Sequence, residues 1–123
     1  MNLPPVFTVL SGDTSVTDII GASPTRCYLF GTAPQNTPQP FVTWNIAVST
    51  PENHLDRLPV VDQDRVQVDC WATSPTVCIQ LAGAVRDALE LHTHMITKLN
   101  MGKDPDTNLH RWVLEFTFWT GRN

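Results

Sequence analysis

The stretch from residue 64 to residue 91 constrains the fold more than any other part of the chain, because it joins a strand pattern directly to a helix pattern. Over residues 65–70 polar and apolar residues alternate, which predicts a strand with one buried face and one solvated face. Ser74 then offers a helix N-cap, and Pro75 suits the first helical position. Apolar residues follow at three- and four-residue spacing and predict one buried helix stripe: Cys78, Leu81, Ala82, Val85, Ala88 and Leu89.

The rest of the chain adds one helix pattern, four strand patterns and two loop patterns. Residues 4–20 predict a helix that is broken near Gly12 and ends at Gly21. Short or alternating apolar runs predict strands at residues 26–30, 41–50, 95–101 and 112–119. Residues 31–40 contain three prolines, and residues 50–64 are polar and interrupted by proline, so both predict loops. Loops of this length in compact domains are usually binding segments, or are disordered in the isolated protein.

Length and composition narrow the class of protein. A chain of 123 residues predicts a single domain over residues 1–123. Eight basic against 12 acidic residues give a net charge of −4, which argues against a protein that grips a phosphate backbone. Charged residues make up only 16% of the chain, compared with about 25% in typical domains. Either some of the surface meets protein, or the surface is polar without charge.

Cysteines and apolar runs indicate the compartment. The three cysteines, an odd number, favour reduced thiols that pack as small hydrophobes over a disulfide framework. The N-terminal residues lack the basic region of a signal peptide, and no apolar run approaches the ~20 residues of a membrane span. We therefore expect a chain that is made and kept in a cytoplasm.

Candidate chemistry is sparse. His92 and His94 are the best candidates for a metal site, but zinc needs a third and usually a fourth ligand, so a solvated pair at a helix end is favoured. No nucleophile elbow, P-loop or dinucleotide-binding motif occurs. The carboxylates of residues 50–64 are those that a polar loop carries by default. The sequence predicts no catalytic residue, no metal site and no cofactor.

Two tryptophans lie where an apolar side chain needs a partner. Trp71 falls on the strand face that is predicted to be solvated, so either a loop of the same subunit covers it or it anchors an interface. In the last strand, residues 112–119, apolar residues occupy both faces, with Trp119 opposite the main apolar row. We expect this strand to lie inside the sheet or against another subunit.

These parts, in this order, resemble the tail completion family of long-tailed phages, small proteins regarded as tail terminators or head–tail joining proteins. The resemblance runs nearly end to end. The block at residues 65–89, with Asp-Cys-Trp-Ala near its centre, is its most specific piece. The other pieces are SVTDIIG at residues 15–21, PFVTWNIAVSTPENHLD at residues 40–56, and WVLEFTFW at residues 112–119.

The resemblance implies an α+β fold, with a mostly antiparallel sheet of four to five strands and two helices packed on one face. It implies a structural virion protein and no enzyme, assembled in the host cytoplasm and located in the tail or neck. Copies of the chain would form a ring, typically a hexamer, that stops polymerisation of the tail tube. The implied partners are the chain itself, the tail tube protein and the head–tail connector or neck protein, with no membrane.

DNA would pass through the lumen of such a ring without specific binding, and the acidic total charge raises the hypothesis of an acidic lumen. We expect the two loops to order on contact with neighbours, tube or neck. The candidate interface residues are Pro38, Pro40, Glu52, His54, Asp56, Arg57, Arg65, Asp69, Trp71 and Trp119. Alternative functions are a head-completion or connector-stopper protein of the neck, a small hydrolase that uses His92 and His94, and a monomeric binding module.

Overall fold

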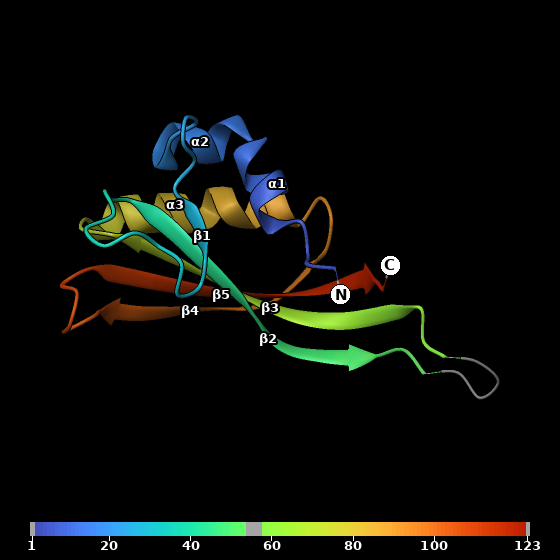
Figure 1. Ribbon diagram of the computed structural model, residues 1–123. Helices are drawn as coiled ribbons and strands as arrows, with labels where there is room; N and C mark the ends of the chain where they lie inside the picture. The colour runs from blue at the N-terminus through green and yellow to red at the C-terminus, as the bar shows by residue number, and fades with distance from the viewer. Residues whose placement is uncertain (1, 54–57, 123) are drawn as a thin grey trace.

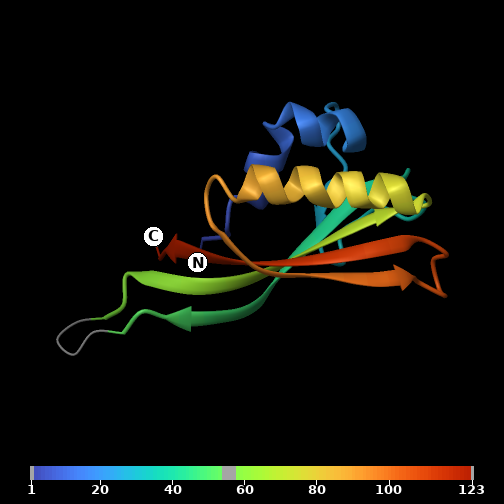
Figure 2. The same cartoon turned by 180° about the vertical axis from the view of Figure 1, so that it is seen from behind.

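The computed structural model describes residues 2–53 and 58–122 (Figure 1). A five-stranded sheet in the order β1-β2-β3-β5-β4 carries the helices on one face, as the two opposite views show (Figures 1 and 2). Strand β1 pairs with β2 in parallel, and the other three pairs are antiparallel. The elements are α1 (Val6–Ser11), α2 (Thr14–Ile20), β1 (Cys27–Leu29), β2 (Phe41–Pro51), β3 (Val61–Ala72), α3 (Pro75–Leu89), β4 (His94–Lys103) and β5 (His110–Gly121).

The predicted α+β class and mostly antiparallel sheet are confirmed. The described residues form three helices, where the sequence predicted two, because the first helical segment divides completely at Gly12. Asp13 caps α2 by accepting a hydrogen bond from the Val16 N–H at 3.2 Å. Gly21, with φ of +89°, ends α2 in a conformation that side chains other than glycine rarely adopt. No helix among the described residues has the length and apolarity needed to cross a membrane.

The strand-to-helix unit forms as its sequence predicts. Strand β3 ends at Ala72, and the Ser74 hydroxyl accepts a hydrogen bond from the Val77 N–H at 3.3 Å. Pro75 is the first residue of α3, where its missing N–H costs nothing. All six residues of the predicted stripe are buried. Helix α3 therefore lies on the face of β3 that presents Val66 and Val68.

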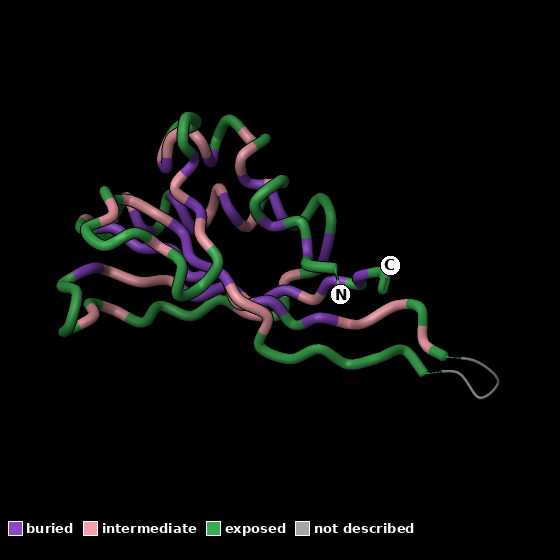
Figure 3. The backbone as a smooth tube through the Cα atoms, in the orientation of Figure 1, coloured by how far each residue is buried: buried purple, intermediate pink, exposed green. Residues whose placement is uncertain are grey.

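The core lies between the sheet and the helix layer, where Figure 3 shows the buried segments. Its largest fully buried side chains are Phe116, Leu10, Ile20, Leu81, Leu89 and Leu114. The three cysteines are free and buried, which confirms that they pack as small hydrophobes. Burial raises the pKa of the Cys27 thiol to about 12 and raises the pKa values of Cys70 and Cys78 as well. These thiols are therefore protonated and poorly reactive at neutral pH.

The prediction of a long loop over residues 50–64 is wrong. Strand β2 continues to Pro51 and β3 begins at Val61, with Pro51 opposite Asp62. We call residues 46–51 and 61–66, paired with each other, the hairpin arm; it projects beyond the helix layer (Figure 1). The sequence did not predict these strand residues because most of them are polar. A strand with few apolar residues lacks the alternation of apolar and polar residues by which strands are recognised. One of these polar residues, Asp64, is buried and accepts a hydrogen bond from the Ser49 hydroxyl.

Strand β5 lies between β3 and β4, which confirms that the apolar last strand is inside the sheet. Phe116 and Leu114 face the helices opposite Val66 and Val68 of β3. The residue following each of them in the chain points to the other side of the sheet. The position of β5 explains why both of its faces are rich in apolar residues.

Candidate interaction surface

In the part of the chain that the structure describes, one face of the sheet has no helix on it (Figures 1 and 2). The pairing registers place alternate residues of each strand on this side, which we call the helix-free face. Polar side chains dominate it, as expected for a sheet surface that faces solvent or a partner. Its main members are Thr43, Asn45, Arg65, Gln67, Asp69, Trp71, Thr97, Leu99, Arg111, Val113, Glu115, Thr117 and Trp119.

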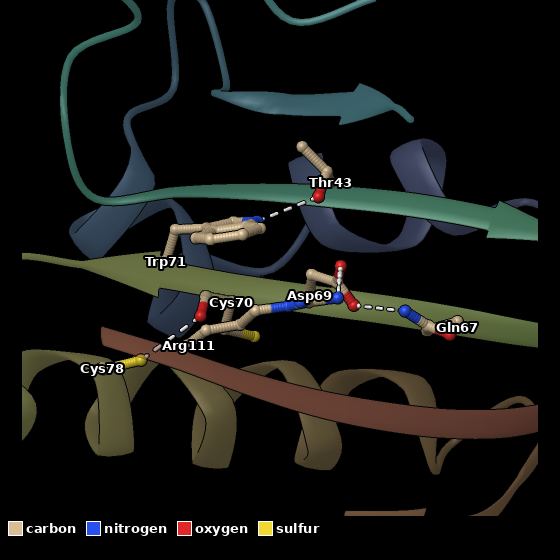
Figure 4. Close-up of polar contacts among 7 residues, drawn as sticks. All are labelled: Thr43, Gln67, Asp69, Cys70, Trp71, Cys78 and Arg111. Atoms are coloured by element: carbon tan, nitrogen blue, oxygen red, sulfur yellow. Dashed lines mark hydrogen bonds and ion pairs between the residues drawn. The ribbon is translucent and has the colours of Figure 1, made fainter. Parts of the chain in front are cut away.

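Trp71 is covered by its own chain, through side chains of the neighbouring strands rather than through the loop that the sequence suggested. Its indole Nε1–H donates to the Thr43 hydroxyl at 3.0 Å. Its ring stacks on Phe41, with centroids 6.1 Å apart, and the Arg111 guanidinium carbon lies 5.0 Å from the ring centroid. Figure 4 shows Trp71 with Thr43 and Arg111. Only 9% of Trp71 is exposed, so most of this side chain stabilises the subunit.

Asp69 is also buried on this face, with 2% exposed. Its Oδ2 accepts a hydrogen bond from Arg111 at 2.9 Å, and its Oδ1 accepts one from the Gln67 side chain at 3.0 Å (Figure 4). The prediction that Asp69 and Trp71 lie on a solvated face is therefore wrong. The reason is that Arg111 on the neighbouring strand covers both of them while remaining partly exposed itself.

Arg65 and Trp119 remain exposed on the helix-free face. Arg65 lines a shallow hollow of about 210 Å³ together with Val48, Thr50, Gln63 and Thr117. Trp119 lies directly opposite Gln63, one of the lining residues, across the β3–β5 pair and is 54% exposed. A large exposed aromatic beside an arginine is a composition that protein interfaces favour.

Pro38, Pro40 and Glu52, three other predicted interface residues, do not line this hollow. Pro38 is exposed in the segment between β1 and β2, whereas Pro40 is half-buried and its carbonyl accepts a hydrogen bond from the Arg26 Nε–H at 2.9 Å. Glu52 is exposed beyond the end of β2, and its N–H donates to the Val61 carbonyl at 3.0 Å. The remaining three, His54, Asp56 and Arg57, lie outside the described residues.

The two histidines singled out in the sequence are exposed at the end of α3 and the start of β4. His92 follows the helix in a turn, and His94 is the first residue of β4. Over residues 2–53 and 58–122, no three His, Cys, Asp or Glu residues are grouped closely enough to hold a metal ion. In that part of the chain the pair therefore lacks the third ligand that zinc requires.

Comparison with known proteins gives the chain its family. Residues 4–121 match the family described as "Tail completion protein gp17". The chain belongs to this family. It is accordingly a structural protein of the phage tail or neck, located in the virion. The prediction of a tail completion protein made from the sequence is confirmed.

A solved structure has the same fold. It is a chain in "Virion of native gene transfer agent (GTA) particle", with a TM-score of 0.76 and 13% sequence identity, over 94% of this chain and 91% of that chain. No curated protein matches the sequence. At this identity the likeness extends to the fold alone.

Sequence reasoning missed two further surface features. The first is the row of exposed apolar residues on β4, which includes Ile96, Leu99 and Met101. Two register shifts in β4 disturb the alternation that would have marked these residues in the sequence. The second is an apolar groove of about 220 Å³ between α3 and the β4–β5 edge, lined by Ile79, Ala82, Gly83, Arg86, Lys98, Trp112 and Leu114. No local sequence signal marks a groove formed by three separate elements.

Proposed function

We propose that this tail completion family protein is the tail terminator. In this role several copies, typically six, form a ring at the head-proximal end of the tail tube. The ring stops polymerisation of the tube and joins the tail to the head or neck. The observation that carries the proposal is the family match over residues 4–121. The protein would act through its surfaces, without catalysis or a cofactor.

The uncovered surfaces of the subunit support assembly into a ring. A closed ring uses a heterologous interface, in which two different sides of the subunit fit each other. The subunit has several uncovered surfaces of different kinds: the helix-free face with Trp119 and Arg65, the exposed outer strand β4, and the segment around Pro38. In this proposal two of these surfaces form the contact between neighbouring copies in the ring, and the tube and neck proteins bind the others.

The net charge of −4 supports passage of DNA without specific binding. The hypothesis of an acidic lumen gains nothing from the helix-free face. Arg65 and Arg111 on that face are balanced by Asp69 and Glu115. A ring that lines its lumen with this face would present mixed charges to DNA.

Electron microscopy of tails assembled with and without the protein tests the proposal. A terminator is expected to leave overlong tubes when it is omitted, because nothing else stops polymerisation. Tubes of normal length that fail to join heads would favour the alternative, a head-completion or connector-stopper protein of the neck. Tails that are normal in length and joined to heads without the protein would overturn both.

A His92→Ala/His94→Ala variant separates assembly from catalysis. Both side chains are exposed, so the variant is expected to fold and to complete tails as well as the unaltered protein does. Tails left incomplete by a folded variant would favour a small hydrolase instead.

The proline-rich segment of residues 31–40 gives a test of contact. Its exposed residues, Pro38 among them, are expected to become covered by the tube or neck in assembled tails. Limited proteolysis should therefore cleave this segment faster in the free subunit than in tails. Equal rates in the two states would mean that residues 31–40 make no contact.

A further inference from the structure

Within the described residues, strands are left unpaired at both ends of the sheet. Strand β4 pairs with β5 along one side, and in the described chain its other side has no strand partner. At the opposite end of the sheet, β1 covers β2 only from Val42 to Trp44. Within the described residues, the edge of β2 from Asn45 to Pro51 is thus also free. Free edges present unpaired backbone N–H and C=O groups that can pair with another strand.

Both free stretches are largely exposed (Figure 3) and carry apolar side chains. On β2, Val48 is 53% exposed, and on β4, Leu99 is 48% exposed. Ile96 and Met101 add two more apolar residues to the β4 stretch. An exposed edge strand with apolar side chains is a liability for a free subunit but suits a subunit that joins another one.

The directions of the two edges match. Strands β2, β3, β5 and β4 are each antiparallel to the next, so β4 runs opposite to β2. A second copy placed beside the first, in the same orientation, therefore brings its β2 antiparallel to β4. The side chains match as well, because Val48 lies opposite Arg65, and Leu99 lies opposite Val113. Val48 and Leu99 thus both point to the helix-free face.

We propose that β4 of one copy pairs antiparallel with residues 45–51 of β2 in the next copy, with Val48 facing Leu99. This inference rests on the proposed ring and names the contact that builds it. The partner is a second copy of this chain, and the sheets of neighbouring copies become one continuous sheet. Backbone hydrogen bonds supply the pairing, and burial of Val48 against Leu99 sets the register.

Strand β1 determines how the copies are staggered. Within one subunit, Leu99 lies level with Thr43 of β2, through Val113 and Asp69. Since β1 occupies that part of β2, the incoming β4 must shift along to Val48, by about 15 Å. Each copy contributes the four strands from β2 to β4 and one gap to the next copy, a repeat of about 19 Å across the strands. Such a shift tilts the strands by about 40° from the ring axis, within the 35–45° that closed barrels use. The offset forced by β1 is therefore compatible with closure.

Cysteine cross-linking in assembled tails tests the pairing. A Val48→Cys/Leu99→Cys variant places the two thiols on one face of the joined sheet, close enough for a disulfide between copies. Mild oxidation is expected to give a ladder of linked chains on a non-reducing denaturing gel. The native thiols of Cys27, Cys70 and Cys78 are buried and should not contribute.

A Val48→Cys/Asn100→Cys variant is the matched control. Asn100 is exposed, like Leu99, but lies opposite Trp112 and so points to the helix side. Linked chains should be about ten-fold fewer in this variant, because the two thiols point to opposite faces. Equal ladders from the two variants, or a stronger ladder from the control, would overturn the pairing.

A second pair of cysteine substitutions tests the same strand pairing in case the first pair alters the fold. Thr50→Cys/Thr97→Cys moves two residues along each strand in the same register, and both positions face the helix-free side. It should give the same ladder. Tails that are completed by these variants but give no ladder with either pair would overturn the β4–β2 contact and leave the terminator role intact. The terminator role itself fails if tubes stop at normal length without the protein.

Discussion

The two faces of β3 and β5 are buried in different ways. On the helix side, Val66 and Phe116 are fully buried by the helix layer. On the helix-free face, Asp69 and Trp71 are nearly as buried, and the contacts that cover them come from side chains of adjacent strands, Arg111 among them. The first face is stabilised by removal of apolar area from water, and the second by paired charge, stacking and hydrogen bonds. Only the second face can also serve as an outer surface of the subunit.

The largest expected effect lies on the helix side. Phe116→Ala removes a fully buried ring and should lower the free energy of unfolding by about 3–5 kcal/mol. Urea denaturation followed by tryptophan fluorescence measures it. The matched control is Phe7→Ala in α1, where the ring is about half exposed and the loss should be much smaller. Similar losses in the two variants would show that the helix-side core is not where stability resides.

The ion pair of the helix-free face should come next. Arg111→Leu leaves the buried Asp69 carboxylate without its cation and should cost about 2–3 kcal/mol of unfolding free energy, less than the ~3–5 kcal/mol of a fully buried pair because Arg111 is partly exposed. Adding Asp69→Asn removes the stranded charge and should recover part of the loss. A double-mutant cycle in urea measures the coupling, and additive losses within about 0.5 kcal/mol would contradict a coupled pair.

A smaller loss of stability is expected from a substitution at the start of α3. Ser74→Ala removes the N-cap of α3 and should cost about 1 kcal/mol, measured by the same denaturation. Ser15→Ala is the control, because Ser15 is an exposed residue inside α2 and does not cap that helix. Equal effects of the two changes would mean that the cap of α3 contributes nothing to the cover of the core.

The smallest effect on stability is expected at the most exposed aromatic of the helix-free face. Trp119→Ala should change the free energy of unfolding by no more than about 0.5 kcal/mol, since the ring is already largely in solvent. Tail completion by the same variant should fall if the ring of Trp119 contacts a partner. A large loss of stability in the free subunit would instead place Trp119 with Trp71 as a residue that stabilises the fold.

Features set by neighbouring residues could be predicted from the sequence, and features set by distant residues could not. The alternation around Val68 and the Ser74-Pro75 start of α3 depend on nearby residues, and both are confirmed. The cover of Trp71 depends on Thr43 and Arg111, which are 28 and 40 positions away in the chain. No local pattern shows which distant strand will lie beside a given residue.

The same reasoning explains the failure at the hairpin arm. Residues 61–64 are polar apart from Val61, and their strand conformation depends on pairing with β2 and β5. Of the candidate interface residues, exposure of Arg65 followed from its strand face, whereas the sequence predicts that Trp119 needs cover and the subunit leaves it exposed. Burial of Asp69 did not follow from its strand face, because a charged residue on a solvated face is normally exposed and only its pairing with Arg111 removes it from water.

The central position of β5 bears on when the subunit can fold. Strand β5 follows every other described element in the chain but lies between β3 and β4, so that Val61 pairs with Gly121 across 60 residues. During synthesis β3 and β4 each lack the strand that pairs with them in the folded sheet until the ribosome has produced β5. Pairings over such separations close slowly, and unpaired strands are prone to aggregate meanwhile. The order of elements thus delays a complete sheet, and with it an assembly-competent subunit, until synthesis of β5 is finished.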